Sequence, residues 1–165
     1  MSRDEFLLLL EKHRANGLLI DTNILVVLLV GRTNRQRIPQ CKRTQSYTVA
    51  EYELLERLVG QFTIVITTPH LLTEVSNLDP LNGRERVTFQ NVYREWVDSA
   101  KEFYDESRSL VVETVFDRLG LADAAITFVA RKGMLVLTDD LPLYAMLSAR
   151  GIDAINFNHI RTLVW

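Results

Sequence analysis

Apolar residues occur along this chain in short blocks, some spaced as in helices and others continuous, as in buried strands. The apolar residues of 4–15 recur at helical spacing, and the pair Asn16-Gly17 predicts the end of that helix. The next block, Leu18–Ile20, is apolar throughout, which is typical of a strand buried on both faces. Ile24–Val30 is also apolar, and the polar turn before it could cap a helix, so we expect a helix there.

The remaining blocks continue this alternation of strands and helices. Further helices are predicted at 49–59, 84–107, 121–132 and 142–150, and another helix is predicted to begin at Pro69. Further strands are predicted at 62–66, 134–137 and 152–156. Residues 110–115 are expected to form a short strand or an extended link. Such alternation is typical of an α/β protein with a mostly parallel sheet. We therefore expect one domain over residues 1–165, with an extra N-terminal helix at about 1–17.

Composition and charge limit the possible functions. A chain of 165 residues with 47% hydrophobic residues fits one globular domain, and its net charge of −2 means that a nucleic-acid partner would need a local basic patch. The lone cysteine, Cys41, excludes an internal disulfide and is consistent with a reducing cytoplasm. The longest apolar stretch, 18–30, is too short and too polar to span a bilayer, and residues 1–10 lack the pattern of a signal peptide. We expect a cytoplasmic protein with no membrane partner.

Carboxylates stand at the edges of the apolar blocks. Asp21 follows the first predicted strand, and the Asp139-Asp140 pair follows the third. Glu74 and Asp123 lie near the starts of predicted helices, which begin at the same edge of a parallel sheet. Carboxylates that gather at one rim repel each other and need a cation or a proton. Oxygen ligands without cysteine or histidine favour Mg²⁺ or Mn²⁺ over zinc.

Four short motifs, in this order along the chain, resemble those of the PIN-domain ribonucleases, with the toxin-type, VapC-like members closest. They are Leu-Leu-Ile-Asp-Thr-Asn at 18–23, Thr-Pro-His-Leu-Leu-Thr-Glu at 68–74, Gly-Leu-Ala-Asp-Ala-Ala-Ile at 120–126 and Leu-Thr-Asp-Asp at 137–140. The resemblance covers residues 18–157, nearly the whole chain. Each motif is weak by itself, whereas four in the right order and structural context are specific.

The resemblance implies a PIN-like fold, a three-layer α/β/α sandwich, and a site that depends on Mg²⁺ or Mn²⁺. It implies an endoribonuclease that hydrolyses single-stranded RNA and leaves a 5′-phosphate and a 3′-hydroxyl. The expected setting is the toxin of a toxin–antitoxin pair or a related stress or defence nuclease, with an antitoxin protein as a partner and a homodimer as the assembly. By their positions in the motifs, the catalytic acids are Asp21, Glu74, Asp123 and Asp140.

These acids have different expected tasks. The ligands of one or two metal ions are Asp21, Asp123 and Asp140, with Asp139 as the alternate to Asp140. Glu74 is expected to bind a second metal, directly or through water, or to orient the attacking water. The hydroxyl and amide groups expected to orient the carboxylates are those of Thr22, Asn23 and Thr138.

Residues 31–48 form a polar interruption that is rich in cations. It carries no acidic residue, and its cations are Arg32, Arg35, Arg37, Lys42 and Arg43. Such a segment is either a solvated loop or a contact surface for RNA phosphates, and both interpretations stay open. Its length and charge depart from the toxin-type pattern, as does the helix that precedes Asp21.

Two other functions compete with the nuclease. A non-catalytic PIN-like scaffold would bind RNA or a partner protein without cutting, although acids at all four positions argue against it. A receiver-like phospho-acceptor domain also has an aspartate after a strand. The only late lysine, Lys132, precedes its strand instead of following it, which argues against the receiver.

Overall fold

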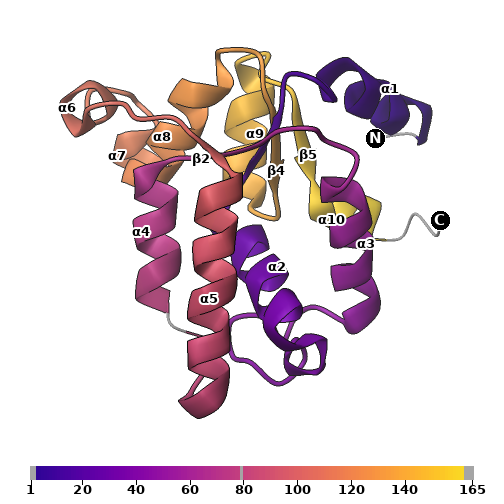
Figure 1. Ribbon diagram of the computed structural model, residues 1–165. Coiled ribbons are helices and arrows are strands. Elements are labelled where there is room, and N and C mark those ends of the chain that lie inside the picture. The colour runs from indigo at the N-terminus through magenta and orange to yellow at the C-terminus, as the bar shows by residue number, and fades with distance from the viewer. Residues whose placement is uncertain (1–2, 79, 162–165) are drawn as a thin grey trace.

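A five-stranded parallel sheet forms the centre of the protein (Figure 1), in a computed structural model that describes residues 3–78 and 80–161. The strands are β1 (Leu18–Ile20), β2 (Val65–Thr67), β3 (Lys101–Glu102), β4 (Leu135–Thr138) and β5 (Ala154–Asn156). Their spatial order is β3-β2-β1-β4-β5, and every neighbouring pair is parallel. Helices flank the sheet on both faces, so the predicted three-layer α/β/α sandwich is confirmed.

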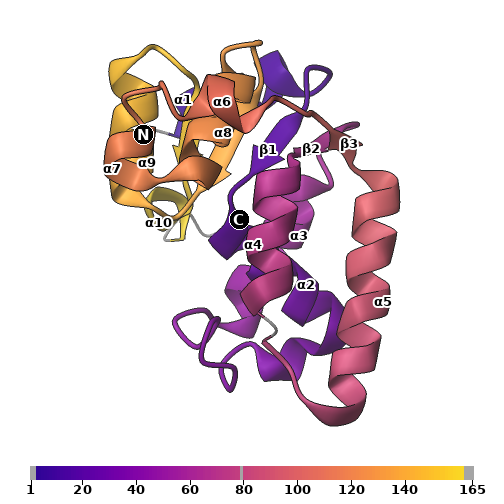
Figure 2. The same cartoon turned by 90° about the vertical axis from the view of Figure 1, so that its left-hand side faces the viewer.

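Helices fill the connections between the strands. They are α1 (Arg3–His13), α2 (Thr22–Asn34), α3 (Val49–Val59), α4 (Pro69–Leu78), α5 (Gly83–Ser99), α6 (Ser107–Leu110), α7 (Phe116–Leu119), α8 (Leu121–Ala130), α9 (Leu141–Ala149) and α10 (Phe157–Ile160), with a 3₁₀ turn at Arg35–Arg37. The predicted helix before β1 is present as α1, while residues 1–2 of its expected range lie outside the described residues. Figure 2 shows α4 between α5 and the segment of α6–α9.

Side chains of the strands alternate between the two faces of the sheet, as the pleat requires. Leu18 and Ile20 of β1 pack in the core that includes α2, α3 and α5. Leu19, between them, packs in the core that includes α8 and α9. Both cores are fully buried at these positions, which explains why β1 is apolar without a break.

Helix α2 lies in the interior of the protein, because every residue from Ile24 to Gly31 is buried. A helix that is apolar on all sides is stable in water only when other elements cover it completely. The helices that cover α2 include α3, α4 and α5. Gly31 allows α3 to approach closely, since a Cβ there would lie 2.2 Å from Cε2 of Tyr52 on α3.

Replacing Gly31 by alanine is therefore expected to destabilise the protein, although glycine to alanine usually stabilises a helix by roughly 0.5–1 kcal/mol. Overpacking against the Tyr52 ring should cost about 1–3 kcal/mol. Urea denaturation of Gly31→Ala measures this loss. The control is Gly31→Ala in a Tyr52→Ala background, where the clash is absent and the substitution should be neutral or stabilising. Equal destabilisation in both backgrounds would contradict the packing explanation.

Two predictions were wrong, namely the end of the helix that begins near residue 84 and the structure of residues 110–115. The helix predicted over 84–107 ends at Ser99, because Ala100 is extended and Lys101-Glu102 pairs with β2 as the edge strand β3. Both residues of β3 are exposed and charged, so they carry no apolar signal. Residues 110–115 contain no strand, and their first residue ends helix α6.

The order of the strands creates a switch point between β1 and β4. The chain leaves β1 for β2 and β3 on one side of the sheet, and returns to β4 and β5 on the other. Ligands of open α/β sheets bind outside the carboxyl ends of the strands at such a point. Asp21 directly follows β1, and Asp139 directly follows β4. The fold thus brings two of the predicted acidic segments to the same place.

Candidate active site

Asp21 lies at the centre of the candidate site. It stands between β1 and α2, and only 5% of its surface is exposed. The register that places Ile20 beside Leu137 puts Asp21 next to Thr138, whose Oγ1 donates a 2.6 Å hydrogen bond to Asp21 Oδ2. The backbone N–H of Asp21 donates to the carbonyl of Leu137 at 2.9 Å. Neighbouring strands therefore hold both the backbone and the carboxylate of Asp21.

Asp139 and Asp140 have different surroundings. Asp139 accepts hydrogen bonds at both carboxylate oxygens, from Asn23 Nδ2 at 3.3 Å and from the Tyr47 hydroxyl. Asp140 caps α9, because its Oδ1 accepts from the N–H of Leu143 at 2.8 Å. Among the described residues, the other carboxylate oxygen of Asp140 accepts no hydrogen bond. Asp140 therefore has a free oxygen for a ligand, whereas the oxygens of Asp139 are occupied.

Glu74 reaches the site from α4. Its side chain is exposed, and its Oε2 accepts a 2.7 Å hydrogen bond from Oγ1 of Thr22 at the start of α2. Helix α4 begins where the sequence predicted, with Thr68 Oγ1 accepting from the N–H of Leu71. Each of the three residues expected to orient a carboxylate donates to one: Thr22 to Glu74, Asn23 to Asp139 and Thr138 to Asp21.

Asp123 completes the group from the first turn of α8. Its pKa is raised from the ordinary 3.8 to about 7, mainly by burial and in addition by the negative charges of Asp21, Asp140 and Glu74. An interaction with all three carboxylates requires that they lie near Asp123. Four segments that are distant in sequence therefore present four acids to one region.

The pKa of Asp21 is also raised to about 7. Burial is the largest cause, and it outweighs the hydrogen bond from Thr138, which lowers the pKa. The charges of Asp139 and Asp140 also contribute to this rise. Near neutral pH the site thus holds more negative charge than its surroundings stabilise, and it favours uptake of a proton or a cation.

The donor types at the site fit a hard divalent cation, since they are carboxylate oxygens and no thiol or imidazole stands among the four acids. Within 3–78 and 80–161, no three Asp, Glu, His or Cys side chains are placed to hold one metal ion together. Mg²⁺ often binds through one or two carboxylates and keeps several water molecules. The residues therefore fit a cation that is bound partly through water molecules better than a cation that is enclosed by protein ligands alone.

Helix N-termini balance part of the negative charge. Asp21 and Asp140 directly precede α2 and α9, and Asp123 lies in the first turn of α8. Each N-terminus carries partial positive charge and unpaired N–H groups, which stabilise nearby anions. The same N–H groups can bind phosphate oxygens, so the rim of the sheet suits a phosphodiester as well as a metal ion.

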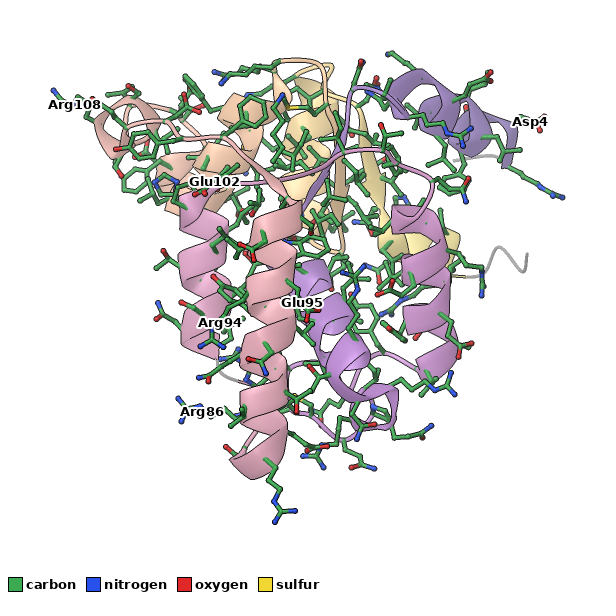
Figure 3. The ribbon with its side chains drawn as sticks, in the orientation of Figure 1. Asp4, Arg86, Arg94, Glu95, Glu102 and Arg108 are labelled. Atoms are coloured by element: carbon green, nitrogen blue, oxygen red, sulfur yellow. The ribbon has the colours of Figure 1, made fainter. Side chains whose placement is uncertain are left out.

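The basic segment divides into neutralised and free cations. Arg32 and Arg35 form ion pairs with glutamates of α3, and Arg37 pairs with Glu85 of α5. Lys42 and Arg43 are exposed and have no ion pair among the described residues. Other cations lie elsewhere, since Figure 3 labels Arg86 and Arg94 on α5 and Arg108 on α6.

Sequence reasoning missed two polar residues that contact the site. Tyr47, in the segment before α3, donates its hydroxyl to Asp139 and stacks on Phe157, at a centroid distance of 5.9 Å. Asn158, in α10, donates to the Asp139 carbonyl at 2.8 Å. No local pattern marks either residue, because both reach Asp139 only through tertiary packing.

Comparison with protein-family models gave no match to this chain, and comparison with curated proteins gave none either. Among the residues that the structure describes, no helix has both the length and the apolar character needed to cross a membrane. Function is therefore inferred from the residues and the geometry of the site.

Proposed function

We propose that this protein is a metal-dependent endoribonuclease of the PIN-like type, which hydrolyses single-stranded RNA in the cytoplasm. The observation that carries the proposal is electrostatic. Asp123 lies close enough to Asp21, Asp140 and Glu74 for each of them to raise its pKa, at the switch point of a parallel sheet. Such clusters of perturbed carboxylates mark functional sites more often than structural ones.

In the proposed reaction, water attacks the phosphorus atom and the bond from phosphorus to the 3′-oxygen breaks. The oxygen of the water becomes part of the new 5′-phosphate, and a proton of the water leaves through the carboxylates to solvent. The leaving 3′-oxygen takes up a proton from solvent and becomes the 3′-hydroxyl. Asp21, Asp123 and Asp140 would hold Mg²⁺ or Mn²⁺, in part through water molecules, and the bound ion would lower the pKa of water and stabilise charge on the phosphate. Glu74, fixed by Thr22, orients the water.

Two arrangements in the protein support these roles. Asp140 is held by the start of α9 and keeps one oxygen free among the described residues, whereas Asp139 is occupied by Asn23 and Tyr47. We therefore assign Asp140, and not Asp139, as the fourth acid. Thr138 connects the two strands of the site, since it donates to Asp21 and accepts from the N–H of Asp140.

A second candidate is the PIN-like scaffold that binds RNA without cutting it. The observation that favours it is that the described part of the chain contains no three metal-binding side chains arranged around one ion. Incubation of the purified protein with labelled single-stranded RNA and Mn²⁺, Mg²⁺ or EDTA separates the two. The nuclease gives products with a 5′-phosphate in the first two conditions and none in EDTA. Intact RNA in every condition would reject the nuclease.

Lys42 and Arg43 are expected to bind RNA phosphates, because their segment reaches the site through Tyr47. Lys42→Ala/Arg43→Ala should weaken binding of single-stranded RNA about tenfold. It should also reduce the slope of log affinity against log salt by about 1–1.5, the value for two lost phosphate contacts. Fluorescence anisotropy over a salt series measures both quantities. Arg35→Ala is the matched control, because Glu53 already neutralises that charge. An unchanged slope in the double variant would exclude this contact.

The proposed setting is that of a toxin or a related stress or defence nuclease, with an antitoxin and a second copy of the chain as partners. The support for this part is the motif resemblance alone. Co-purification with the product of an adjacent small gene tests the antitoxin, and light scattering tests the homodimer.

A further inference from the structure

A surface groove of about 500 Å³ adjoins the acid site between α4 and α8. The groove is formed by Pro69, His70, Thr73, Glu74, Asn77, Leu121 and Ala122. Glu74 belongs both to the groove and to the acid group, and Leu121 and Ala122 directly precede Asp123. A molecule in this groove would therefore touch the candidate site at one end. The volume falls within the roughly 300–1,000 Å³ of ordinary small-molecule sites.

Some polar side chains of the groove make no hydrogen bond within the part of the chain that the structure describes. Thr73 and Asn77 lie one helical turn apart on α4, are exposed, and make no side-chain hydrogen bond within the described residues. The Nε2 atom of His70 lies 3.3 Å from Ser107 Oγ, at the start of α6. Its Nδ1 is buried and has no hydrogen-bond partner in the described part of the chain. Thr73 and Asn77 thus offer a hydroxyl and an amide group that the described residues leave available to a ligand.

The charges of the side chains that line the groove indicate which kind of ligand it can bind. Apart from Glu74 its lining has no acid, and no lysine or arginine is among the described residues that form it. A phosphate group would meet the Glu74 carboxylate with no cation to compensate it. A flat neutral ring, in contrast, can rest on Pro69 and Leu121 and on the imidazole, while its edge meets amide and hydroxyl groups. Unstacked RNA bases are recognised in this way.

We propose that this groove binds a nucleobase of the RNA strand, next to the phosphate presented to the acids. This inference rests on the proposed function, and it adds where a base is held. The base stacks against His70 and Leu121, and its edge hydrogen-bonds with Asn77 and Thr73. Phosphates of the strand lie outside the groove, toward the helix N-termini at the rim. The groove would therefore determine which nucleotide stands beside the cleaved bond.

Binding to uncut RNA tests the groove separately from cleavage. The probes are labelled RNAs of about eight nucleotides, either of A, of C or of U, and a strand of the same length with abasic riboses. Anisotropy in EDTA gives the affinity of the full-length protein for each probe. The variants are Thr73→Ala/Asn77→Ala, and Ser76→Ala as the control, since Ser76 lies on the same helix but outside this groove.

The wild type and Ser76→Ala should bind at least one base-containing RNA about tenfold more tightly than the abasic strand. Thr73→Ala/Asn77→Ala should lose most of this difference while binding the abasic strand normally. With Mn²⁺, the same variant should cut at changed positions. Equal affinity of the wild type for all probes would overturn the inference, even if RNA is cleaved. Base-dependent binding without cleavage would support the groove and reject the nuclease.

Discussion

Asp21→Asn should abolish RNA cleavage in the presence of Mn²⁺ or Mg²⁺, with a loss of about a thousandfold or more. Loss of a charged ligand removes several kcal/mol of charge stabilisation, and each 1.36 kcal/mol corresponds to a factor of ten in rate. The fold should survive, because the side-chain oxygen of asparagine can still accept the hydrogen bond from Thr138. Single-turnover cleavage of a labelled RNA, with circular dichroism of the same sample, measures both properties.

Three other variants serve as comparisons for the loss of cleavage in Asp21→Asn. Asp123→Asn should lose activity to a similar extent, because Asp123 belongs to the same group of carboxylates. Asp139→Asn should lose less, since Asn23 and Tyr47 already occupy its oxygens. Asp98→Asn changes an exposed acid of α5 and should cleave normally. Wild-type cleavage by Asp21→Asn would reject the proposed reaction.

Without metal, the stability of the wild type should fall as pH rises from about 4 to about 7. The pKa of Asp21 is about 7 in the folded protein, whereas an exposed aspartate, as in the unfolded chain, has the ordinary value of 3.8. In this range the folded protein therefore holds a proton that the unfolded chain has released, so the free energy of unfolding decreases with pH. Above pH 7 Asp21 is ionised in both the folded and the unfolded state, and the full cost of the buried charge, about 4 kcal/mol, remains.

Asp21→Asn removes this cost. In EDTA the free energy of unfolding of the variant should therefore exceed that of the wild type by an amount that grows from near zero at pH 4 to a few kcal/mol at pH 8. Comparison at each pH cancels the groups whose pKa does not depend on Asp21. Asp123 does not cancel, because loss of the Asp21 charge also removes one cause of its raised pKa, and this increases the difference in the same direction. Mn²⁺ at pH 8 should stabilise the wild type by about 2.7 kcal/mol at a hundredfold excess over Kd, and the variant far less. Denaturant titrations at each pH measure the difference. A constant difference would mean that Asp21 has an ordinary pKa.

Much of the fold could be predicted from local sequence. The unbroken apolar run of β1 identified a strand buried on both faces, and the Thr68-Pro69 pair identified the start of α4. These signals are local, because burial and helix capping act over a few neighbouring residues. The edge strand β3 could not be predicted, since its residues Lys101 and Glu102 are exposed. Only pairing with β2, which the local sequence does not encode, makes them a strand.

For the candidate site, too, some features could be predicted from the sequence and others could not. The sequence by itself determined which carboxylates stand at the ends of buried elements, and it predicted a parallel sheet that would bring them to one rim. Tertiary structure alone decided that Asp139 is occupied by Tyr47 while Asp140 keeps an oxygen free among the described residues. It also decided that Lys42 and Arg43 stay unpaired within those residues, and that the pKa of Asp21 rises. The physical reason is that hydrogen bonding, ion pairing and desolvation depend on distances between segments far apart in sequence, which only the packed chain fixes.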